Sequence, residues 1–295
     1  MNQSIFKGTG VALVTPFKRD GNVDLKALGD ITEHVIKNSV EYLVVLGTTG
    51  ETPTLREPEK KSIVKQVREV NGGRVPLVVG MGGKSTGDLI VKIKEADYEG
   101  VNGILTVSPY YNKPGQRGLY EHYMMVAEAS PVPVIIYNVP SRTGSNISAE
   151  TTVKLAAESE KFAGIKEASG DIIQIMKIAR SKPGRFQLIS GDDAMTLPLI
   201  AAGGSGVISV VGNAFPRQTS EMVRLALENR WEEARSIHYS LMEIIECLFV
   251  EGNPAGVKAA LNILNICENQ LRMPLVPVTK TTYTKLTDLI KSIPI

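Results

Sequence analysis

The stretch Phe162-Ala163-Gly164-Ile165-Lys166-Glu167-Ala168-Ser169-Gly170 has the pattern of a short apolar strand that ends in a turn of small residues. Asp171 follows at the position of a helix N-cap, and Ile172, Ile175 and Met176 then recur at helical spacing. The stretch therefore predicts one strand–turn–helix unit.

The same unit recurs through about the first three quarters of the chain. Eight apolar stretches are strand candidates: Gly10–Val14, Tyr42–Leu46, Leu77–Gly80, Gly103–Val107, Val134–Tyr137, Phe162–Lys166, Phe186–Ser190 and Gly206–Val211. Helix patterns lie between them, with N-caps at Asp24 and Ser85 and with Pro58 opening another helix. Such continuously apolar strands are typical of a parallel sheet covered by helices on both faces. Eight units in roughly 230 residues favour a TIM (β/α)8 barrel over an open doubly wound sheet.

The pattern changes near Trp231 to helices alone. The helix candidates are Trp231–Phe249, Pro254–Leu264 and Thr281–Ile290. No linker rich in Gly or Ser precedes them, so we expect this appendage to be docked on the barrel rather than tethered. The sequence predicts a catalytic barrel domain over residues 1–229 and a C-terminal helical domain over residues 230–295.

The composition fits an ordinary soluble globular protein, with 295 residues, 43% hydrophobic and 22% charged. A formal net charge of +2 gives no basic field of the kind that nucleic-acid binding requires. The N-terminus lacks the pattern of a secretory signal, and no apolar run is long enough to span a bilayer. We expect neither a nucleic-acid nor a membrane partner, and a cytoplasmic location is the default.

The cysteines and histidines do not suggest a metal site. Cys247 and Cys267 lie in apolar, helix-like surroundings without a CxxC pairing, which predicts buried core thiols rather than a disulfide. His34, His122 and His238 stand alone, with no second ligand at metal-binding spacing. We therefore expect a mechanism without a metal ion.

Lys166 is the candidate nucleophile. An ammonium at the end of an apolar strand loses solvation, which lowers its pKa from about 10.4 toward the range where the neutral amine reacts. A neutral amine can condense with a ketone to form a Schiff base. A lysine taken alone more often snorkels to water. The residues at the other strand ends decide between these readings, because catalytic groups of a TIM barrel lie there.

Polar residues follow several of the predicted strands. They are Gly47-Thr48-Thr49-Gly50-Glu51, Ser108-Pro109-Tyr110-Tyr111-Asn112-Lys113-Pro114, Tyr137-Asn138-Val139-Pro140-Ser141-Arg142-Thr143-Gly144 and Ser190-Gly191-Asp192-Asp193. Taken singly, each has a simpler role in helix capping, packing or a surface ion pair. Their shared location at one end of the barrel favours an active site. Asp192 and Asp193 we expect mainly to cap the helix after the seventh strand.

Three of these stretches, Gly47–Glu51, Pro109–Pro114 and Tyr137–Gly144, together with Gly164-Ile165-Lys166-Glu167-Ala168, resemble the dihydrodipicolinate synthase family over essentially the whole chain. The wider superfamily includes N-acetylneuraminate lyase and 2-keto-3-deoxy acid aldolases. These relatives share the lysine, the tyrosine at Tyr137 and the Gly-x-Thr-Gly-Glu turn. Arg142 in Ser-Arg-Thr-Gly is the element that favours the synthases.

The resemblance implies a Schiff-base condensation of pyruvate with L-aspartate 4-semialdehyde, on the diaminopimelate route to lysine and without a cofactor. Lys166 would form the Schiff base. Thr48 and Tyr137 would relay protons together with Tyr111, which the family supplies across a tight dimer interface. The family also implies a homotetramer, built as a dimer of dimers.

The resemblance also implies the binding residues. The backbone around Thr48 and Thr49 would hold the pyruvate carboxylate, and Gly191 and Ile208 would line the pocket through main-chain groups. Arg142 would bind the semialdehyde carboxylate, since its planar fork can bond both oxygens.

Many of these synthases are inhibited by lysine, which binds in a cleft between subunits. The matching positions here are Thr52, Pro53, Glu57, Lys60, Lys84, Asp88 and Tyr110. Lys60 and Lys84 stand where sensitive members have neutral or imidazole groups, and their charge would repel a cationic effector. We expect weak or absent inhibition by lysine.

Three alternatives remain open at this stage. A sister aldolase acting on a keto-deoxy acid or a sialic acid is the nearest, and Arg142 argues against it. Gly203-Gly204-Ser205-Gly206 allows a phosphate- or flavin-binding barrel but also reads as a helix end and turn. Gly82-Gly83-Lys84-Ser85 resembles the end of a P-loop, but Val78 stands where the first glycine of that motif should be, which argues against nucleotide binding. A non-catalytic carboxylate-binding barrel is the third.

Overall fold

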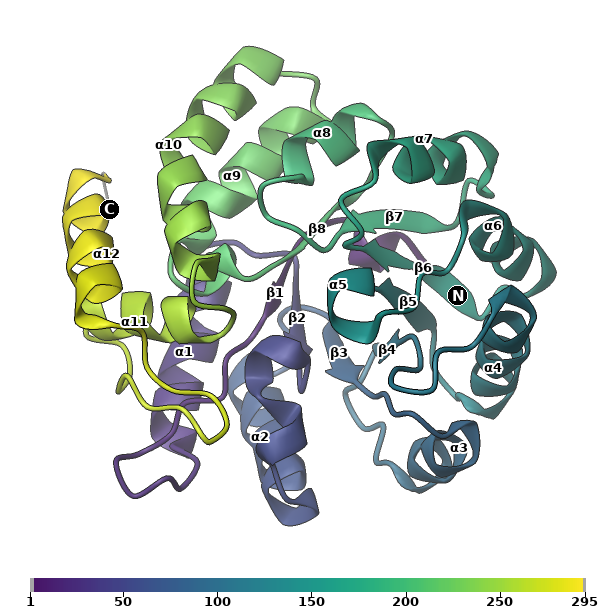
Figure 1. Cartoon of the computed structure of the whole chain (residues 1–295), viewed down its shortest axis with the longest axis horizontal. Coiled ribbons are helices and arrows are strands. Elements are labelled where there is room, and N and C mark those ends of the chain that lie inside the picture. The colour runs from purple at the N-terminus through teal and green to yellow at the C-terminus, as the bar shows by residue number, and fades with distance from the viewer. Residues whose placement is uncertain (1–2, 294–295) are drawn as a thin grey trace.

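The eight predicted strands close into one parallel barrel in the computed structural model, which describes residues 3–293 (Figure 1). The strands are β1 (Gly8–Ala12), β2 (Tyr42–Val45), β3 (Leu77–Gly80), β4 (Gly103–Val107), β5 (Val134–Asn138), β6 (Phe162–Glu167), β7 (Gln187–Ser190) and β8 (Gly206–Ser209). Each strand pairs with the next, and β8 closes the barrel by pairing Gly206 with Gly8. The TIM barrel is confirmed, although β1 begins and ends two residues earlier than predicted; Leu13 and Val14, which follow it, pack in an outer apolar cluster.

Helices surround the barrel in the order that the sequence predicts. They are α1 (Leu25–Lys37), α2 (Glu57–Asn71), α3 (Thr86–Glu95), α4 (Gln116–Ala129), α5 (Pro140–Thr143), α6 (Ala149–Glu158), α7 (Ile172–Ser181), α8 (Thr196–Ala201) and α9 (Pro216–Leu227), with short 3-10 turns η1 (Gln3–Phe6), η2 (Thr48–Gly50), η3 (Thr52–Thr54) and η4 (Val211–Asn213). The predicted caps are present: Asp24 accepts the Ala27 backbone N–H at 3.0 Å, and Asp171 accepts that of Ile173 at 2.9 Å.

Side chains fill the barrel interior. Its buried members are Phe6, Ala12, Tyr42, Val44, Val78, Leu105, Ile135, Tyr137, Val139, Ala163, Ile189 and Ile208. Phe6 of η1 is fully buried, lies 5.8 Å from the Tyr42 ring, and packs close to Gly103 at the start of β4. Because this packing closes the N-terminal end, a substrate can enter only where the strands end.

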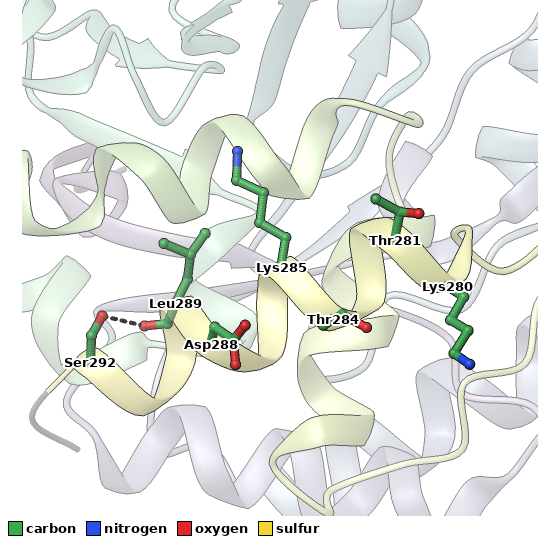
Figure 2. Close-up of a pocket in the computed structure, with 7 residues that line it drawn as sticks. All are labelled: Lys280, Thr281, Thr284, Lys285, Asp288, Leu289 and Ser292. Carbon is green, nitrogen blue, oxygen red and sulfur yellow. Dashed lines mark hydrogen bonds between the residues drawn. The ribbon is translucent and has the colours of Figure 1, made fainter.

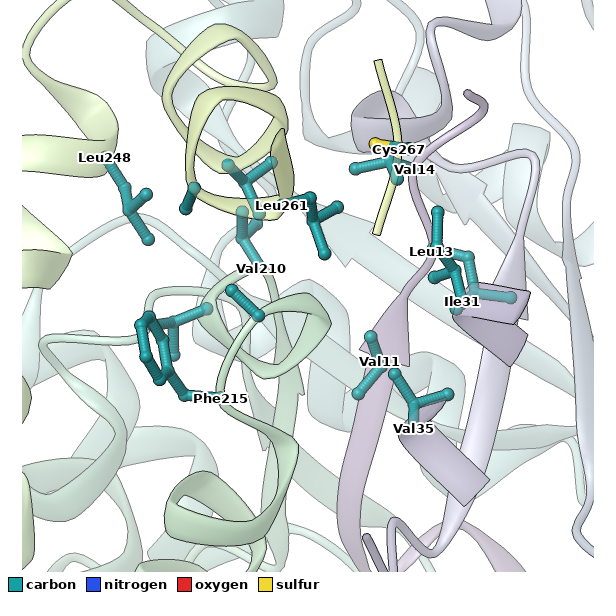
Figure 3. Close-up of a cluster of buried hydrophobic side chains, with 14 of the residues drawn as sticks. Val11, Leu13, Val14, Ile31, Val35, Val210, Phe215, Leu248, Leu261 and Cys267 are labelled. Carbon is teal, nitrogen blue, oxygen red and sulfur yellow. The ribbon is translucent and has the colours of Figure 1, made fainter. Parts of the chain in front are cut away.

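Three C-terminal helices pack against one side of the barrel, beside α9 (Figure 1). They are α10 (Trp231–Phe249), α11 (Ala255–Ile263) and α12 (Lys280–Ser292). Figure 3 shows Leu248 and Leu261 of these helices above Val210 and Phe215, in one cluster with Val11 of β1. The prediction of a docked appendage is confirmed, whereas a domain boundary at residues 229 and 230 stays a prediction.

Cys247 and Cys267 are free and buried, as predicted. Within residues 3–293, no helix is long and apolar enough to cross a membrane. The same residues contain no group of three or more His, Cys, Asp or Glu side chains that could hold a metal ion.

Candidate active site

An extra residue in β6 determines where Lys166 points. Val134 of β5 pairs with Phe162, but the next residue of β5 pairs with Gly164, so Ala163 has no partner of its own. Phe162 packs in the outer apolar layer. Side chains of a strand alternate between its faces, so Lys166, four positions after Phe162, would also face outward in a regular strand. The bulge shifts this alternation by one residue and turns Lys166 inward.

The partners of Lys166 confirm its inward direction. It pairs with Tyr137 of β5 and Ile189 of β7, and both side chains belong to the barrel interior. Gly164 makes this register possible, because a Cβ at that position would lie 2.4 Å from the carbonyl oxygen of Gln187. Glycine is therefore required where β6 bulges beside β7.

The Lys166 side chain is buried without an opposite charge in contact. It is 5% exposed, and its Nζ lies 4.5 Å from the centre of the Tyr137 ring. No residue in the described part of the chain forms an ion pair or hydrogen bond with this nitrogen. Burial lowers the pKa of Lys166 to about 8, the Asp193 carboxylate opposes this shift, and the Arg142 charge adds to it. At that pKa about a tenth of the side chains are neutral at pH 7, against about one in three thousand for an unperturbed lysine.

Thr48 and Tyr137 lie at the same end of the barrel as Lys166. Thr48 begins η2, directly after β2, and its side chain lies near enough to the Tyr137 phenol to lower the pKa of that group. Burial raises the pKa of Tyr137, although the Arg142 charge and the Thr48 side chain oppose this shift. Tyr137 therefore keeps its proton near neutral pH, and the hydroxyl pair can pass a proton along.

The main chain of Gly191 lies against the lysine. A Cβ at Gly191 would lie 3.0 Å from both Cγ and Cε of Lys166, so any side chain there would displace it. Ile208 of β8 is 1% exposed and belongs to the interior cluster. Both predicted lining residues thus lie at the barrel interior or its rim.

Arg142 lies on α5, a short helix that crosses in front of β5 at the open end of the barrel (Figure 1). Its side chain is exposed, yet its charge lowers the pKa of both Tyr137 and Lys166. Arg142 is thus accessible to solvent and still close enough to the buried side chains of Tyr137 and Lys166 to affect their pKa values. This is a suitable place to receive an anionic substrate.

Tyr111 is not brought together with the other predicted relay residues. It lies on the loop between β4 and α4, is 81% exposed, and stacks under Lys84, whose Nζ lies 5.7 Å from the ring centre. Its φ of 73° is costly for a bulky side chain. One chain alone therefore forms a site from Lys166, Tyr137, Thr48 and Arg142, without Tyr111.

The positions of the possible effector cleft lie on η3, α2, α3 and the loops before α3 and α4. Lys60 is already paired with Glu57, with Nζ and Oε1 2.7 Å apart. This hydrogen bond lowers the pKa of Glu57. Lys84 is exposed and contacts only the Tyr111 ring among the described aromatic side chains.

The prediction that Asp193 caps a helix is wrong. Asp192 does accept the Ala194 backbone N–H at 2.9 Å, as a capping residue would. Asp193 is instead 4% exposed, and it accepts hydrogen bonds from the Ser209 hydroxyl at 2.5 Å and the Val210 N–H at 3.0 Å. Its carboxylate therefore ties the end of β7 to the end of β8 beside Lys166. Sequence spacing gave no sign of this contact, because β8 follows α8.

Sequence reasoning also missed two polar residues of the C-terminal region that reach the Thr48–Thr49 turn. Asn253 donates a hydrogen bond to the Thr49 hydroxyl, and Lys258 forms a fully buried ion pair with Glu51. A signal was present in the sequence. Lys258 is the only charged residue in the apolar helix pattern Pro254–Leu264.

A surface hollow along α12 has no link to this site. It is lined by Lys280, Thr281, Thr284, Lys285, Asp288, Leu289 and Ser292. Figure 2 shows Lys280 and Lys285 pointing away from each other. We assign it no function.

The lowered pKa of Lys166 predicts its labelling by an amine-acylating reagent. Because only the neutral amine reacts, labelling should rise through about pH 8 and level off above it. In Asp193→Asn the midpoint should move to lower pH, since the carboxylate that favours the ammonium is removed. Peptide mapping across about pH 6 to about pH 10 measures both. A midpoint near pH 10 would show that Lys166 is solvated.

Comparison with known proteins agrees with this geometry. A family model described as the dihydrodipicolinate synthetase family matches residues 5–293. The 4-hydroxy-tetrahydrodipicolinate synthase of Parabacteroides distasonis is 51% identical over 289 residues, covering 98% of this chain and 97% of the relative. The crystal structure of the Thermotoga maritima dihydrodipicolinate synthase superposes with a TM-score of 0.95 at 42% identity, covering 97% of this chain and 98% of that one.

A second solved structure bears on the site. The dihydrodipicolinate synthase of Acinetobacter baumannii, complexed with pyruvate, is 37% identical with a TM-score of 0.93, covering 97% of this chain and 98% of that one. These relatives favour the synthases over the sister aldolases, phosphate-binding barrels and non-catalytic barrels considered above. The chain belongs to the dihydrodipicolinate synthetase family: it is a lyase that works through a Schiff base and without a cofactor, with the activity of a 4-hydroxy-tetrahydrodipicolinate synthase.

Proposed function

We propose that the chain condenses pyruvate with L-aspartate 4-semialdehyde and that Lys166 carries the Schiff base. One observation carries this assignment: a buried lysine, with no ionic partner in the described part of the chain, lies against Tyr137 at the open end of the barrel. The Acinetobacter baumannii relative binds pyruvate, which supports a keto acid as the first substrate. A cytoplasmic location stays a prediction from the sequence.

The reaction follows from the chemistry of an imine. The neutral amine of Lys166 adds to the ketone carbon of pyruvate, and loss of water leaves a protonated imine. The positive nitrogen draws electrons from the adjacent bond, so the methyl carbon loses a proton and becomes an enamine. The enamine carbon adds to the aldehyde of the second substrate and its oxygen takes up a proton. The amine of that substrate then attacks the imine carbon, closes the ring and releases Lys166.

The other residues of the site would have two roles, proton transfer and substrate binding. Thr48 and Tyr137 would move protons to and from the carbinolamine and the new hydroxyl. The backbone N–H groups around Thr48 and Thr49 would hold the pyruvate carboxylate. Gly191 and Ile208 would shape the pocket, since a larger group at Gly191 would push Lys166 aside.

Tyr111 would act in the site of a second subunit, within a homotetramer of two tight dimers. Its 81% exposure and its costly backbone conformation support a role away from its own barrel. Light scattering should give the mass of four chains. A monomeric, fully active enzyme would contradict this assignment.

Borohydride trapping tests the proposed function. With pyruvate and borohydride, intact mass should show one reduced adduct per chain, and peptide mapping should place it on Lys166. The buried Lys258 is an internal control, because its ion pair with Glu51 should protect it. Lys166→Arg should give no adduct. Absence of an adduct on the unmodified enzyme would refute the Schiff base, and trapping without turnover of the semialdehyde would point to a different second substrate.

Arg142→Ala should raise the KM for the semialdehyde about tenfold to hundredfold, since hydrogen bonds to charged groups contribute roughly 1.5–3 kcal/mol. The KM for pyruvate should change less than about threefold. The pKa of Lys166 should rise as well, because the Arg142 charge now lowers it. Steady-state kinetics with each substrate varied in turn measures the difference. Equal effects on both KM values would contradict this role.

Lysine should inhibit the enzyme weakly or not at all. An incoming lysine would meet the charge of Lys84 and would have to displace Lys60 from Glu57. Assays with low-millimolar lysine should therefore retain most of the activity, while the variant Lys60→Gln/Lys84→Gln should become more sensitive. Strong inhibition of the unmodified enzyme would end this proposal.

A further inference from the structure

Glu51 ends the turn that follows β2, and it is a buried carboxylate in a costly conformation. It is 2% exposed, and its φ of 52° lies in the left-handed region. A buried charge needs an opposite charge and hydrogen bonds to be tolerated, and a strained backbone needs surrounding contacts to persist. The contacts that meet both needs come from the C-terminal region.

Lys258 of α11 supplies the opposite charge. Its Nζ lies 2.5 Å from Glu51 Oε1, and neither side chain has any exposed surface. The same Nζ donates to the Gln270 carbonyl at 2.9 Å and lies 4.1 Å from the centre of the Phe17 ring. The other carboxylate oxygen of Glu51 accepts the Arg272 backbone N–H at 3.0 Å. The ion pair is thus fully enclosed and both carboxylate oxygens are bonded.

Asn253 holds a second side chain of the same turn. Its Nδ2 donates to the Thr49 hydroxyl at 2.9 Å, and both residues are buried. The two contacts join residues 204 and 207 positions apart in the sequence. The C-terminal helical region therefore holds the turn after β2 at two side chains, Thr49 and Glu51.

We propose that Glu51, Lys258 and Asn253 are positioning residues for the turn that binds the pyruvate carboxylate. This inference rests on the proposed role of Thr48 and Thr49 in that binding. The contacts of Lys258 with Glu51 and of Asn253 with Thr49 fix the directions in which the backbone N–H groups of the turn point. Lys258 also cancels the charge of Glu51, which if left unpaired behind the turn would repel an anionic substrate.

A second, partly exposed ion pair lies at the other end of β2. Glu41 immediately precedes the strand, and its Oε1 accepts a hydrogen bond from Arg224 of α9 at 2.9 Å. Its Oε2 accepts the Thr9 N–H at 2.7 Å. This pair also joins distant parts of the chain to β2, but at the closed end of the barrel. Arg224→Met therefore controls for general loss of stability.

The experiment compares Lys258→Met with Arg224→Met. We expect Lys258→Met to raise the KM for pyruvate about tenfold or more, because alignment of the bound carboxylate is lost. The KM for the semialdehyde should stay within about twofold. Borohydride should still trap pyruvate on Lys166 when pyruvate is saturating. Arg224→Met should lower the melting temperature and leave both KM values unchanged.

Two results would overturn the inference: an unchanged pyruvate KM in folded Lys258→Met, or equal increases for both substrates. If Lys258→Met fails to fold, Glu51→Gln/Lys258→Met removes the unpaired buried charge. Its pyruvate KM should still exceed that of the unmodified enzyme, and an unchanged value would overturn the inference. Failure of the unmodified enzyme to trap pyruvate would instead reject the proposed function itself.

Discussion

The site depends on one extra residue in one strand. A regular β6 that buried Phe162 against the outer helices would direct Lys166 into the same layer. Because of the bulge at Ala163, the same strand places the apolar side chain of Phe162 outside the barrel and the amine of Lys166 inside it. Gly164 is the steric condition for this arrangement, since β7 leaves no room for a Cβ beside the bulge. Lys166 is thus placed by backbone register before any side chain contributes.

Electrostatics then sets the proton equilibrium of Lys166. Burial removes water from the amine, and no residue within 3–293 replaces the water by a hydrogen bond or ion pair. Two charges act from nearby with opposite effects on the pKa of Lys166: Asp193 raises it and Arg142 lowers it. Each has a second role, Asp193 in joining β7 to β8 and Arg142 at the open end of the barrel. The reactivity of the lysine is therefore coupled to the integrity of two loops.

The sequence predicted the barrel and its strands well, because a continuously apolar strand followed by a capped helix is a local pattern. It placed Lys166, Tyr137, Thr48 and Arg142 at strand ends, and the structure brings these four to one end of the barrel. It did not predict that Lys166 faces inward, since a bulge is a property of two paired strands. The buried roles of Asp193 and Glu51 were missed for the same reason, as their partners lie on other elements. Tyr111 remains a prediction because its role requires a second chain.

The ion pair of Glu51 and Lys258 bears on the order in which the protein becomes functional during synthesis. The turn after β2 emerges early from the ribosome, whereas its two side-chain anchors lie 204 and 207 residues later. A nascent chain that has completed its eight strands still lacks Asn253 and Lys258. Contacts of such long sequence separation also form late in folding, because they must first overcome the entropy of closing the loop. The turn after β2 therefore gains its second anchor only after nearly nine tenths of the 295 residues have been made.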